Sequence, residues 1–414
     1  MTSYIATQLT RLEHFVQRHD YAGYDPYDAL NSPVLCAASG GTKWGRIACT
    51  QLLKRCPVNV RPFLGIRPGH NPKALGLFLE GYARLHRREP CDEFADSAAY
   101  LIRRLAELST PTRSGHGWGY NFDWQSRAFF VPKFTPSIVC SSFVAHALLD
   151  AAEVFGSQQA YQLALPVGEF LLRDLNRTIE GNCFCFSYTP LDRYAVHNAS
   201  LLGASVLIRL HRLTGSAGLR DAALAALAYS MKHQRENGSW FYSERDTAHW
   251  VDSFHTGFNL EAVRRFLKAG EALTYRQAYT RGVRFYADEF FLPDGTPKYY
   301  AGRTFPIDIH AAAEAISFFA DEGAPFAPLV ERVLGWTFAN LADDRGFFYY
   351  QKGPRLTNRI PYMRWGQAWM FRALAAAMNA LNVTSSKRTY ACPAGEANAS
   401  VNHAFDRFAR LGCL

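Results

Sequence analysis

A helical unit recurs about six times along the 414 residues of this chain. In its clearest copy, residues 250–270, Asp252 and His255 precede apolar residues at helical spacing, and a glycine ends the helix. Equivalent helices begin at His70, Thr135, His197, His255, His310 and Arg364. These positions lie about 54 to 66 residues apart, which is the length of two helices and their connections. The pattern predicts a closed ring of helical hairpins.

The same periodicity predicts an all-α fold, an (α/α)6 toroid with short β-like segments at its rim. We expect one toroid domain over residues 1–382 and a C-terminal tail, with one short helix, over 383–414. An amphipathic helix is predicted near residues 3–18, a first hairpin from helices at 44–55 and 73–87, and an outer helix at 92–108. Further helices are predicted at 136–154, 158–175, 198–213, 217–234, 256–268, 274–290, 309–320, 326–340 and 364–381.

Composition narrows the class of protein. With 48% apolar and 20% charged residues, the chain is typical of soluble globular proteins. The net charge of +9 comes from scattered Lys and Arg, without a basic run interleaved with aromatic residues, so we expect no nucleic-acid partner. The N-terminal segment has charges throughout, and the nine cysteines form no CxxC pair. We therefore expect a cytoplasmic protein without stable membrane insertion.

Polar and aromatic residues gather just before the predicted inner helices, at one mouth of the ring. Three of these helices have an Asp two to five residues before a His, and each such Asp could equally be an ordinary N-cap. The positive end of a helix favours anions and keeps a nearby imidazole neutral. We predict catalytic roles for His255, His310, His197, Asp252, Asp308 and Tyr299. We predict substrate binding by Trp118, Tyr120, Trp124, Arg193, Asn198, Tyr242, Arg303, Arg364 and Trp365.

Common cofactor and nucleophile motifs do not occur in the sequence. There is no G-x-S-x-G, G-x-G-x-x-G or P-loop, and no HExxH. The three His residues could gather a zinc ion only if the fold brought them together. We therefore predict no cofactor and no metal.

Five segments carry a resemblance to known proteins: residues 118–136, 196–205, 250–261, 296–316 and 360–370. The hairpin pattern resembles the (α/α) toroids, which include terpene cyclases, protein prenyltransferases, six-hairpin glycosidases, polysaccharide lyases and sugar epimerases. Residues 21–378 are similar to an uncharacterised bacterial family that is found beside surface-polysaccharide biosynthesis genes and often mislabelled as aminolevulinate dehydratase. That enzyme would be a β/α barrel with paired lysines, a pattern that this helical sequence lacks. The DxDD and DDxxD motifs of terpene enzymes are also missing, so the toroid enzymes that act on lipid substrates are disfavoured.

The resemblance implies a carbohydrate-active enzyme of surface-polysaccharide (exopolysaccharide) biosynthesis. We expect it to act on a uronate-containing or otherwise anionic saccharide by epimerase or lyase chemistry, with His or Tyr moving a proton and Arg stabilising the charge. One alternative is a glycoside hydrolase that uses Asp252 and Asp308 as its carboxylate pair. Another alternative is a non-catalytic saccharide-binding protein. Whether the protein is an enzyme or a binding protein, we expect it to contact polysaccharide-assembly machinery.

Overall fold

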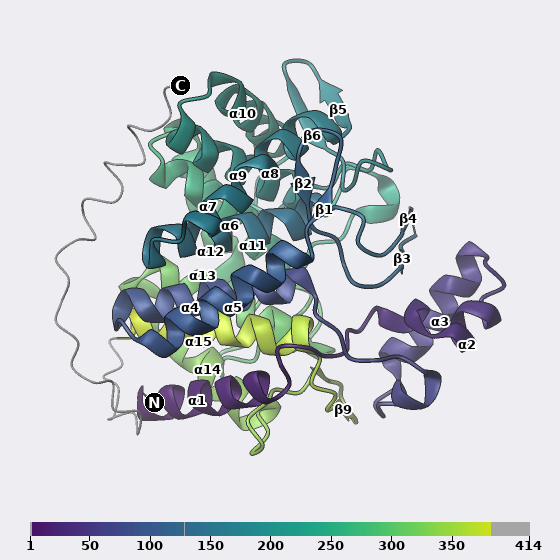
Figure 1. The fold of residues 1–414 in the computed structure, drawn as a ribbon. Coiled ribbons are helices and arrows are strands. Elements are labelled where there is room, and N and C mark those ends of the chain that lie inside the picture. The colour runs from purple at the N-terminus through teal and green to yellow at the C-terminus, as the bar shows by residue number, and fades with distance from the viewer. Residues whose placement is uncertain (1, 128, 382–414) are drawn as a thin grey trace.

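The computed structural model describes residues 2–127 and 129–381 (Figure 1). The predicted tail, with its short helix, lies outside this range. The fold is built mainly from helices, and its strands are short pieces at the rim.

Six inner helices form a closed ring. Each helix packs against the next one in the chain, and the last packs against the first. They are α4 (Pro72–Arg88), α6 (Ile138–Phe155), α9 (His197–Thr214), α11 (Ser253–Lys268), α13 (Ile309–Glu322) and α15 (Ala368–Ala380). Because each inner helix faces both the ring centre and an outer helix, its residues are buried on most sides. Among the described residues α6 alone is long and apolar enough to span a bilayer, and 72% of it is buried inside the ring.

Each inner helix has an outer partner, which makes six hairpins. Five outer elements follow their partners in the chain: α5 (Asp92–Glu107), α7 (Gln158–Ala164) with α8 (Pro166–Glu169) and the π-helical turn η3 (Phe170–Asp174), α10 (Ala217–Lys232), α12 (Arg276–Glu289) and α14 (Ala327–Leu341). The sixth is the N-terminal helix α1 (Thr2–Arg18), which packs against α15. Its residues Ile5, Leu9 and Leu12 are buried, as its amphipathic pattern predicts.

The predicted hairpin of residues 44–55 with 73–87 is wrong. The outer partner of α4 is α5, while the earlier helix belongs to a lobe beside the ring (Figure 1). This lobe consists of η1 (Asp28–Asn31), α2 (Pro33–Ala38), α3 (Lys43–Arg55) and η2 (Pro62–Leu64). It has its own small core of Ala29, Leu53 and Ile66. Ser32 and Thr42 cap α2 and α3 through their side-chain oxygens, so both helices begin where the sequence provides a cap.

The strands lie at the rim, all in antiparallel pairs. They are β1 (Thr110–Pro111) with β2 (His116–Gly117), β3 (Trp124–Gln125) with β4 (Phe130–Val131), β5 (Arg177–Glu180) with β6 (Cys183–Phe186), and the sheet β7 (Ile307–Asp308), β8 (Gln351–Lys352), β9 (Thr357–Asn358). In the last sheet Asp308 is in register with Gln351. Short turns complete the description: η4 (Asp246–Ala248), η5 (Leu273–Tyr275), η6 (Ala324–Phe326) and η7 (Met363–Gln367).

Glycines allow the inner helices to approach closely at two seams of the ring. A Cβ atom on Gly81 of α4 would lie 2.5 Å from Cδ1 of Phe371 on α15. A Cβ atom on Gly257 of α11 would lie 2.6 Å from Cγ of Glu314 on α13. Both separations are below van der Waals contact, so a larger residue would push these helices apart.

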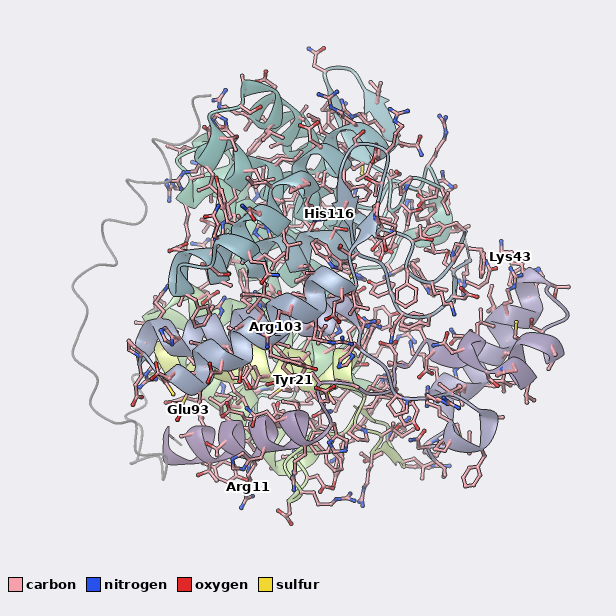
Figure 2. All side chains as sticks on the ribbon, viewed as in Figure 1. Arg11, Tyr21, Lys43, Glu93, Arg103 and His116 are labelled. Atoms are coloured by element: carbon pink, nitrogen blue, oxygen red, sulfur yellow. The ribbon has the colours of Figure 1, made fainter. Side chains whose placement is uncertain are left out.

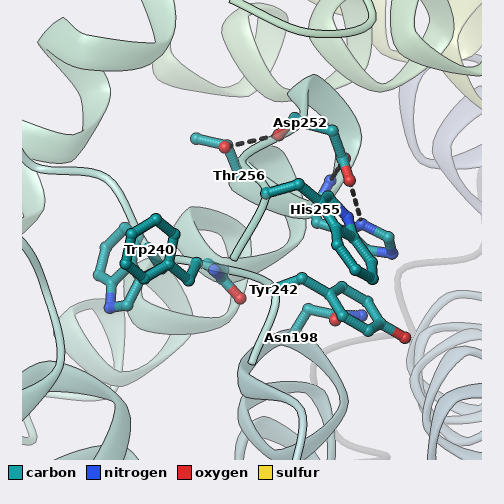
Figure 3. Close-up of a pocket in the computed structure, with 9 residues that line it drawn as sticks. Asn198, Trp240, Tyr242, Asp252, His255 and Thr256 are labelled. Carbon is teal, nitrogen blue, oxygen red and sulfur yellow. Dashed lines mark hydrogen bonds and ion pairs between the residues drawn. The ribbon is translucent and has the colours of Figure 1, made fainter. Parts of the chain in front are cut away.

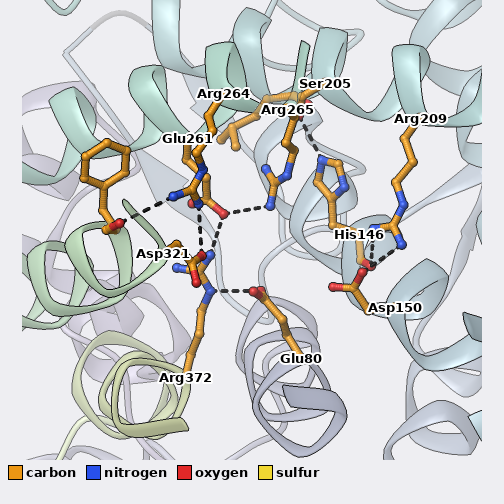
Figure 4. A network of polar contacts seen from close by, with 12 residues as sticks. Glu80, His146, Asp150, Ser205, Arg209, Glu261, Arg264, Arg265, Asp321 and Arg372 are labelled. Carbon is orange, nitrogen blue, oxygen red and sulfur yellow. Dashed lines mark hydrogen bonds and ion pairs between the residues drawn. The ribbon is translucent and has the colours of Figure 1, made fainter. Parts of the chain in front are cut away.

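A buried network of charges joins four inner helices at the ring centre (Figure 4). Arg372 of α15 donates to Glu80 of α4 at 2.9 Å and to Glu261 of α11 at 2.5 Å. It also contacts Glu314 of α13 at 3.4 Å. Burial, together with the charge of Glu261, raises the pKa of Glu314 well above its usual range. We infer that Glu314 is protonated at neutral pH, which reduces the repulsion among the three acids.

Candidate active site

A cavity of about 310 Å³ opens at the end of the ring where the inner helices begin. All six inner units contribute to it through residues at or just before their helix N-termini, as the sequence predicts. Its lining consists of Tyr27, Lys54, Lys73, Tyr120, Phe122, Trp124, Val139, Tyr188, Asn198, Tyr242, Trp250, Asp252, Phe254, His255, Phe258, Tyr299, Tyr300, His310, Arg364 and Trp365. Aromatic side chains predominate, with a few basic groups and a single carboxylate among these residues.

Asp252 and His255 form a pair in the wall of the cavity (Figure 3). Asp252 is the N-cap of α11, where Oδ1 accepts the backbone N–H of His255 at 3.0 Å. Its Oδ2 lies 2.7 Å from Nδ1 of the same histidine. Because a carboxylate only accepts hydrogen bonds, the imidazole proton resides on Nδ1. In the neutral ring, Nε2 then carries the lone pair and can accept a proton.

A small recess of about 10 Å³ lies beside this pair, with room for about one water. It shares Asn198, Tyr242 and Asp252 with the main cavity (Figure 3). The side-chain oxygens of Asn198 and Asn259, both of which line the recess, are buried without a hydrogen-bond partner among the described residues. Buried amide oxygens normally have a partner, so these groups are free to bind a ligand or a water.

His310 is the second imidazole of the cavity, and it is almost fully buried. Its ring stacks on Phe254 at 4.5 Å between ring centres and packs against Trp369 at 4.4 Å. Neither ring nitrogen has a hydrogen-bond partner among the described residues. Burial, assisted by the nearby charge of Lys73, lowers the pKa of His310 well below its usual range. The neutral ring thus offers one N–H donor and one lone pair to whatever occupies the cavity.

Lys73, the second residue of α4, is a buried cavity residue that the sequence analysis did not select. Its ammonium group lies 4.1 Å from the centre of the Phe143 ring and 5.1 Å from that of Trp369. Burial, with a contribution from the charge of Arg364, lowers the pKa of Lys73 to about 7. It follows Pro72 at the start of an apolar helix, where an exposed lysine would look the same, so the sequence contains no local signal of its burial.

Two further basic groups face the cavity. Arg364 makes a bidentate ion pair with buried Asp25, with Nε to Oδ2 at 2.5 Å and Nη2 to Oδ1 at 2.8 Å. Lys54 of α3 donates to the hydroxyl of Tyr27 at 2.7 Å. Asp25 pairs with Arg364, so the other cations among the described cavity residues are Lys54 and, when protonated, Lys73, against the single carboxylate of Asp252.

The phenols of the cavity act as hydrogen-bond groups rather than as bases. Burial raises the pKa of Tyr120 to about 12, and burial also raises the pKa values of Tyr188, Tyr242 and Tyr299 above their usual range. At neutral pH these hydroxyls keep their protons and can donate them. The hydroxyls of Tyr120 and Tyr188 lie 3.3 Å apart and form a hydrogen bond.

Ten of the fifteen predicted site residues line the cavity: Asp252, His255, His310, Tyr299, Tyr120, Trp124, Asn198, Tyr242, Arg364 and Trp365. Their placement agrees with the prediction, whereas their roles remain predictions. The other five lie elsewhere, and two of these were predicted to be catalytic.

His197 and Asp308 are buried outside the cavity lining. His197 contacts Ser230 through Nδ1 at 3.1 Å and Glu244 through Nε2 at 2.8 Å, so both ring nitrogens have partners. Asp308 caps α13 and accepts the indole N–H of Trp365 at 2.8 Å. Burial raises the pKa of Asp308 to about 6. These contacts support a structural role for His197 and Asp308, because neither side chain lines the cavity where a substrate would bind.

The three predicted binding residues outside the lining are Trp118, Arg193 and Arg303. Trp118 is fully buried and donates its indole N–H to the carbonyl of Leu105 at 2.8 Å, so it belongs to the core. Arg193 is exposed. Arg303 is also exposed and lies over the ring of Tyr300, a cavity residue, at 5.0 Å.

The three predicted histidines do not converge on a common point, since His197 faces Glu244 while the other two line the cavity. Across residues 2–127 and 129–381, no three His, Cys, Asp or Glu side chains group closely enough to hold a metal ion.

Comparison with known proteins places the fold. No protein-family model and no curated sequence matches the chain. Solved structures match over most of its length. Cellobiose 2-epimerase from Bacillus thermoamylovorans B4167 has a TM-score of 0.59 at 14% identity, covering 75% of this chain and 87% of that one. The GH76 α-mannanase of Bacteroides thetaiotaomicron has a TM-score of 0.55 at 13% identity, with 75% and 88% covered.

A polysaccharide lyase has a TM-score of 0.54 at 12% identity, and the match covers 76% of this chain and 92% of that one. The chain has the (α/α)6 toroid fold. The predicted fold class is thereby confirmed. At identities this low, similarity to these solved structures shows the fold alone. The chemistry has to be argued from the residues of the site.

Proposed function

We propose that this protein is a carbohydrate-active enzyme that moves a proton at a carbon next to the carboxylate or carbonyl group of an anionic saccharide. The observation that carries the proposal is the Asp252–His255 pair, whose 2.7 Å contact orients a basic Nε2 in the wall of an aromatic cavity. A base held in one tautomer by a buried carboxylate is the arrangement that proton abstraction requires.

The cavity supports a saccharide as the substrate. Its volume of about 310 Å³ falls at the small end of ordinary ligand sites, which suits one or two sugar units. Its aromatic rings can pack on the apolar faces of sugars, and the phenols and Asn198 can bind hydroxyl groups. The toroids with similar folds include, by their descriptions, an epimerase, a mannanase and a polysaccharide lyase.

The basic groups support an anionic substrate, for which a uronate is our choice. Lys54, Lys73 and Arg364 come from different elements and face the same cavity, where Asp252 is the one carboxylate among the described lining residues. A substrate carboxylate beside Lys73 would favour its charged form and provide the ion pair that the ammonium group lacks. The same pair would stabilise negative charge as it develops during proton removal.

The proposed reaction is an exchange of protons around one carbon. Nε2 of His255 takes the proton from the carbon beside the substrate carboxylate, and the electron pair of the broken C–H bond moves into that carboxylate. Return of a proton to the opposite face from a water molecule bound by His310 gives the epimer, and the hydroxide left behind takes the proton that His255 removed. Expulsion of the oxygen substituent on the next carbon instead gives an unsaturated sugar, with a phenol protonating the leaving oxygen.

The geometry disfavours the predicted hydrolase. Glycosidases that use two carboxylates need both of them at the scissile bond. Asp308 is held by Trp365 and Gln351 outside the cavity lining, so the predicted pair does not face one substrate. The sequence resemblance to a family found with polysaccharide genes supports a role in bacterial surface-polysaccharide biosynthesis, in the cytoplasm and in contact with the assembly machinery.

The test is proton exchange followed by NMR. Purified protein in deuterated buffer is incubated with a panel of uronate-containing oligosaccharides, and His255→Ala is run beside it. The matched control is His249→Ala, because His249 is exposed, stacks on Phe241 and is not a cavity residue. We expect deuterium at the carbon beside the carboxylate, or an unsaturated product, with wild type and the control but not with His255→Ala. New reducing ends without exchange would indicate a hydrolase, and binding without turnover would indicate a saccharide-binding protein.

A further inference from the structure

Most of the lobe beside the ring, residues 33–68, carries many exposed apolar side chains. We call residues 33–68 the arm; they contain α2, α3 and η2, and the arm projects away from the helical ring in Figure 1. Trp44 and Leu52 are 70% and 72% exposed, and Phe63 is 88% exposed. Val34 and Val58 are also exposed, so five of the twelve large apolar residues that are exposed in the described part of the chain fall within this short segment. Soluble monomers rarely expose apolar groups in such clusters without a binding function.

Helix α3 shows that this surface is organised. Trp44, Ala48 and Leu52 are spaced by four residues, so they share one face of the helix, and all three are exposed. The opposite face carries Leu53, which is buried in the small core of the lobe. The helix is therefore anchored by one apolar face while a second apolar face has no partner among the described residues.

The charge of the arm is entirely positive. The sequence contains no Asp or Glu from residue 29 to residue 79, whereas the arm itself contains Lys43, Arg46, Lys54, Arg55, Arg61 and Arg67. Arg61 is buried and paired with Asp28 at 2.7 Å. Lys43, Arg55 and Arg67 are exposed, and Figure 2 shows Lys43 at the end of the arm. Exposed apolar groups thus share this segment with exposed cations, and the segment itself contains no acidic residue.

We propose that the arm docks on the surface of a membrane that contains anionic phospholipids. Aromatic and aliphatic side chains that enter the headgroup region, together with cations that meet anionic lipid, are the two features of helices that lie on membranes. A second copy of this chain would bring like charges together, which disfavours the arm as a site of self-association. The inference concerns a surface outside the catalytic cavity and does not depend on the proposed reaction.

The arm also borders the mouth of the cavity. Lys54 extends from α3 to line the cavity, and the guanidinium of Arg46 lies 4.3 Å from the centre of the Phe130 ring on β4. On α3, Arg46 and Lys54 face the ring, whereas Trp44 and Leu52 lie on the other side of the helix. Docking through Trp44 and Leu52 would therefore hold the ring at the membrane through the arm.

The test uses the full chain and sedimentation with vesicles. Wild-type protein is mixed with vesicles of phosphatidylcholine alone, or with 30% phosphatidylglycerol, at about 0.1 M salt. The variants are Trp44→Ser with Leu52→Ser, and Lys43→Gln with Arg55→Gln. The matched control is Ile179→Ser with Leu273→Ser, which removes two exposed apolar side chains outside the arm. All substituted residues are exposed, so thermal unfolding should match wild type.

We expect wild type and the control to sediment with the anionic vesicles and not with phosphatidylcholine alone. The Trp44 and Leu52 variant should bind at least about tenfold more weakly, and loss of two charges should weaken binding roughly thirtyfold. Failure of wild type to bind anionic vesicles, or equal binding by the arm variants, would overturn the inference. So would a wild-type dimer in sedimentation velocity that Trp44→Ser with Leu52→Ser converts to a monomer, because the arm would then be a contact between copies.

Discussion

The ammonium group of Lys73 lies 4.1 Å from the centre of the Phe143 ring, and no carboxylate among the described residues forms an ion pair with it. Burial without such a pair explains why its pKa falls to about 7. This lysine is therefore both a component of the proposed substrate site and a source of instability in the free protein.

Lys73→Met should stabilise the protein below pH 7 and have less effect as the pH rises toward 10. The unfolded chain keeps the lysine protonated up to about pH 10.5 while the folded one releases the proton near 7, so wild-type stability rises with pH across this window. The full shift corresponds to ~5 kcal/mol. Urea unfolding of wild type and variant from pH 6 to 10 measures it. Lys133→Met, at an exposed lysine, should show no such pH-dependent difference.

Asp252→Asn should separate catalysis from folding. Asparagine caps a helix about as well as aspartate, so stability should stay within about 1 kcal/mol of wild type. The amide can no longer hold a protonated imidazole by its charge, and the rate of proton exchange should fall roughly 100-fold to 10,000-fold. Exchange rates and thermal unfolding are measured together. Full activity in this variant would remove the Asp252–His255 pair from the mechanism.

Asp308→Asn should change stability and leave proton exchange nearly unchanged, the reverse of Asp252→Asn. Burial raises the pKa of Asp308 to about 6, so ionisation between about pH 4 and 6 costs the folded protein stability, on the order of 3 kcal/mol. The variant should lack this loss, because asparagine can still accept from Trp365 without becoming charged. Proton exchange should remain within about threefold of wild type. A loss as large as that of Asp252→Asn would show that Asp308 takes part in the reaction.

Substitutions in the network around Arg372 should show which of its acids is protonated and which is ionised. Glu314 is protonated by our inference, so Glu314→Gln should change the free energy of unfolding by less than about 1 kcal/mol. Burial alone would raise the pKa of Glu80, but Arg372 and Arg84 outweigh burial and lower it. Glu80→Gln should therefore cost about 3–5 kcal/mol. Chemical unfolding at pH 7 compares the two, and equal costs would contradict the assigned protonation states.

The ring was predictable from sequence because each hairpin carries its own local pattern. Helix period, caps and glycines repeat, so the inner helices could be located without knowing their neighbours. The pairing of α1 with α15 was not predictable in this way, because it joins the two ends of the described chain and has no local signal. The same is true of α3, whose amphipathic pattern indicates a helix but not what the helix packs against.

The site was predictable to the extent that it lies at helix N-termini. His255 and His310 follow a capping Asp in the same pattern, and both line the cavity. Yet Asp252 faces His255 while Asp308 is bound by Trp365, a residue 57 positions later in the chain. The burial of Lys73 likewise depends on rings from α6 and α15. Such contacts are set by closure of the ring and cannot be read from the residues beside them.

The pairing of α1 with α15 has a consequence for how the chain acquires its structure. Helix α1 ends at Arg18 and α15 begins at Ala368. Because synthesis proceeds from the N-terminus, α15 cannot cover the apolar face of α1 until the residues between them have been made. Until then Ile5, Leu9 and Leu12 remain open to solvent or to other chains. In a nascent chain the apolar face of α1 therefore stays uncovered until α15 has been made, and the α1–α15 hairpin forms only after the other five have been synthesised.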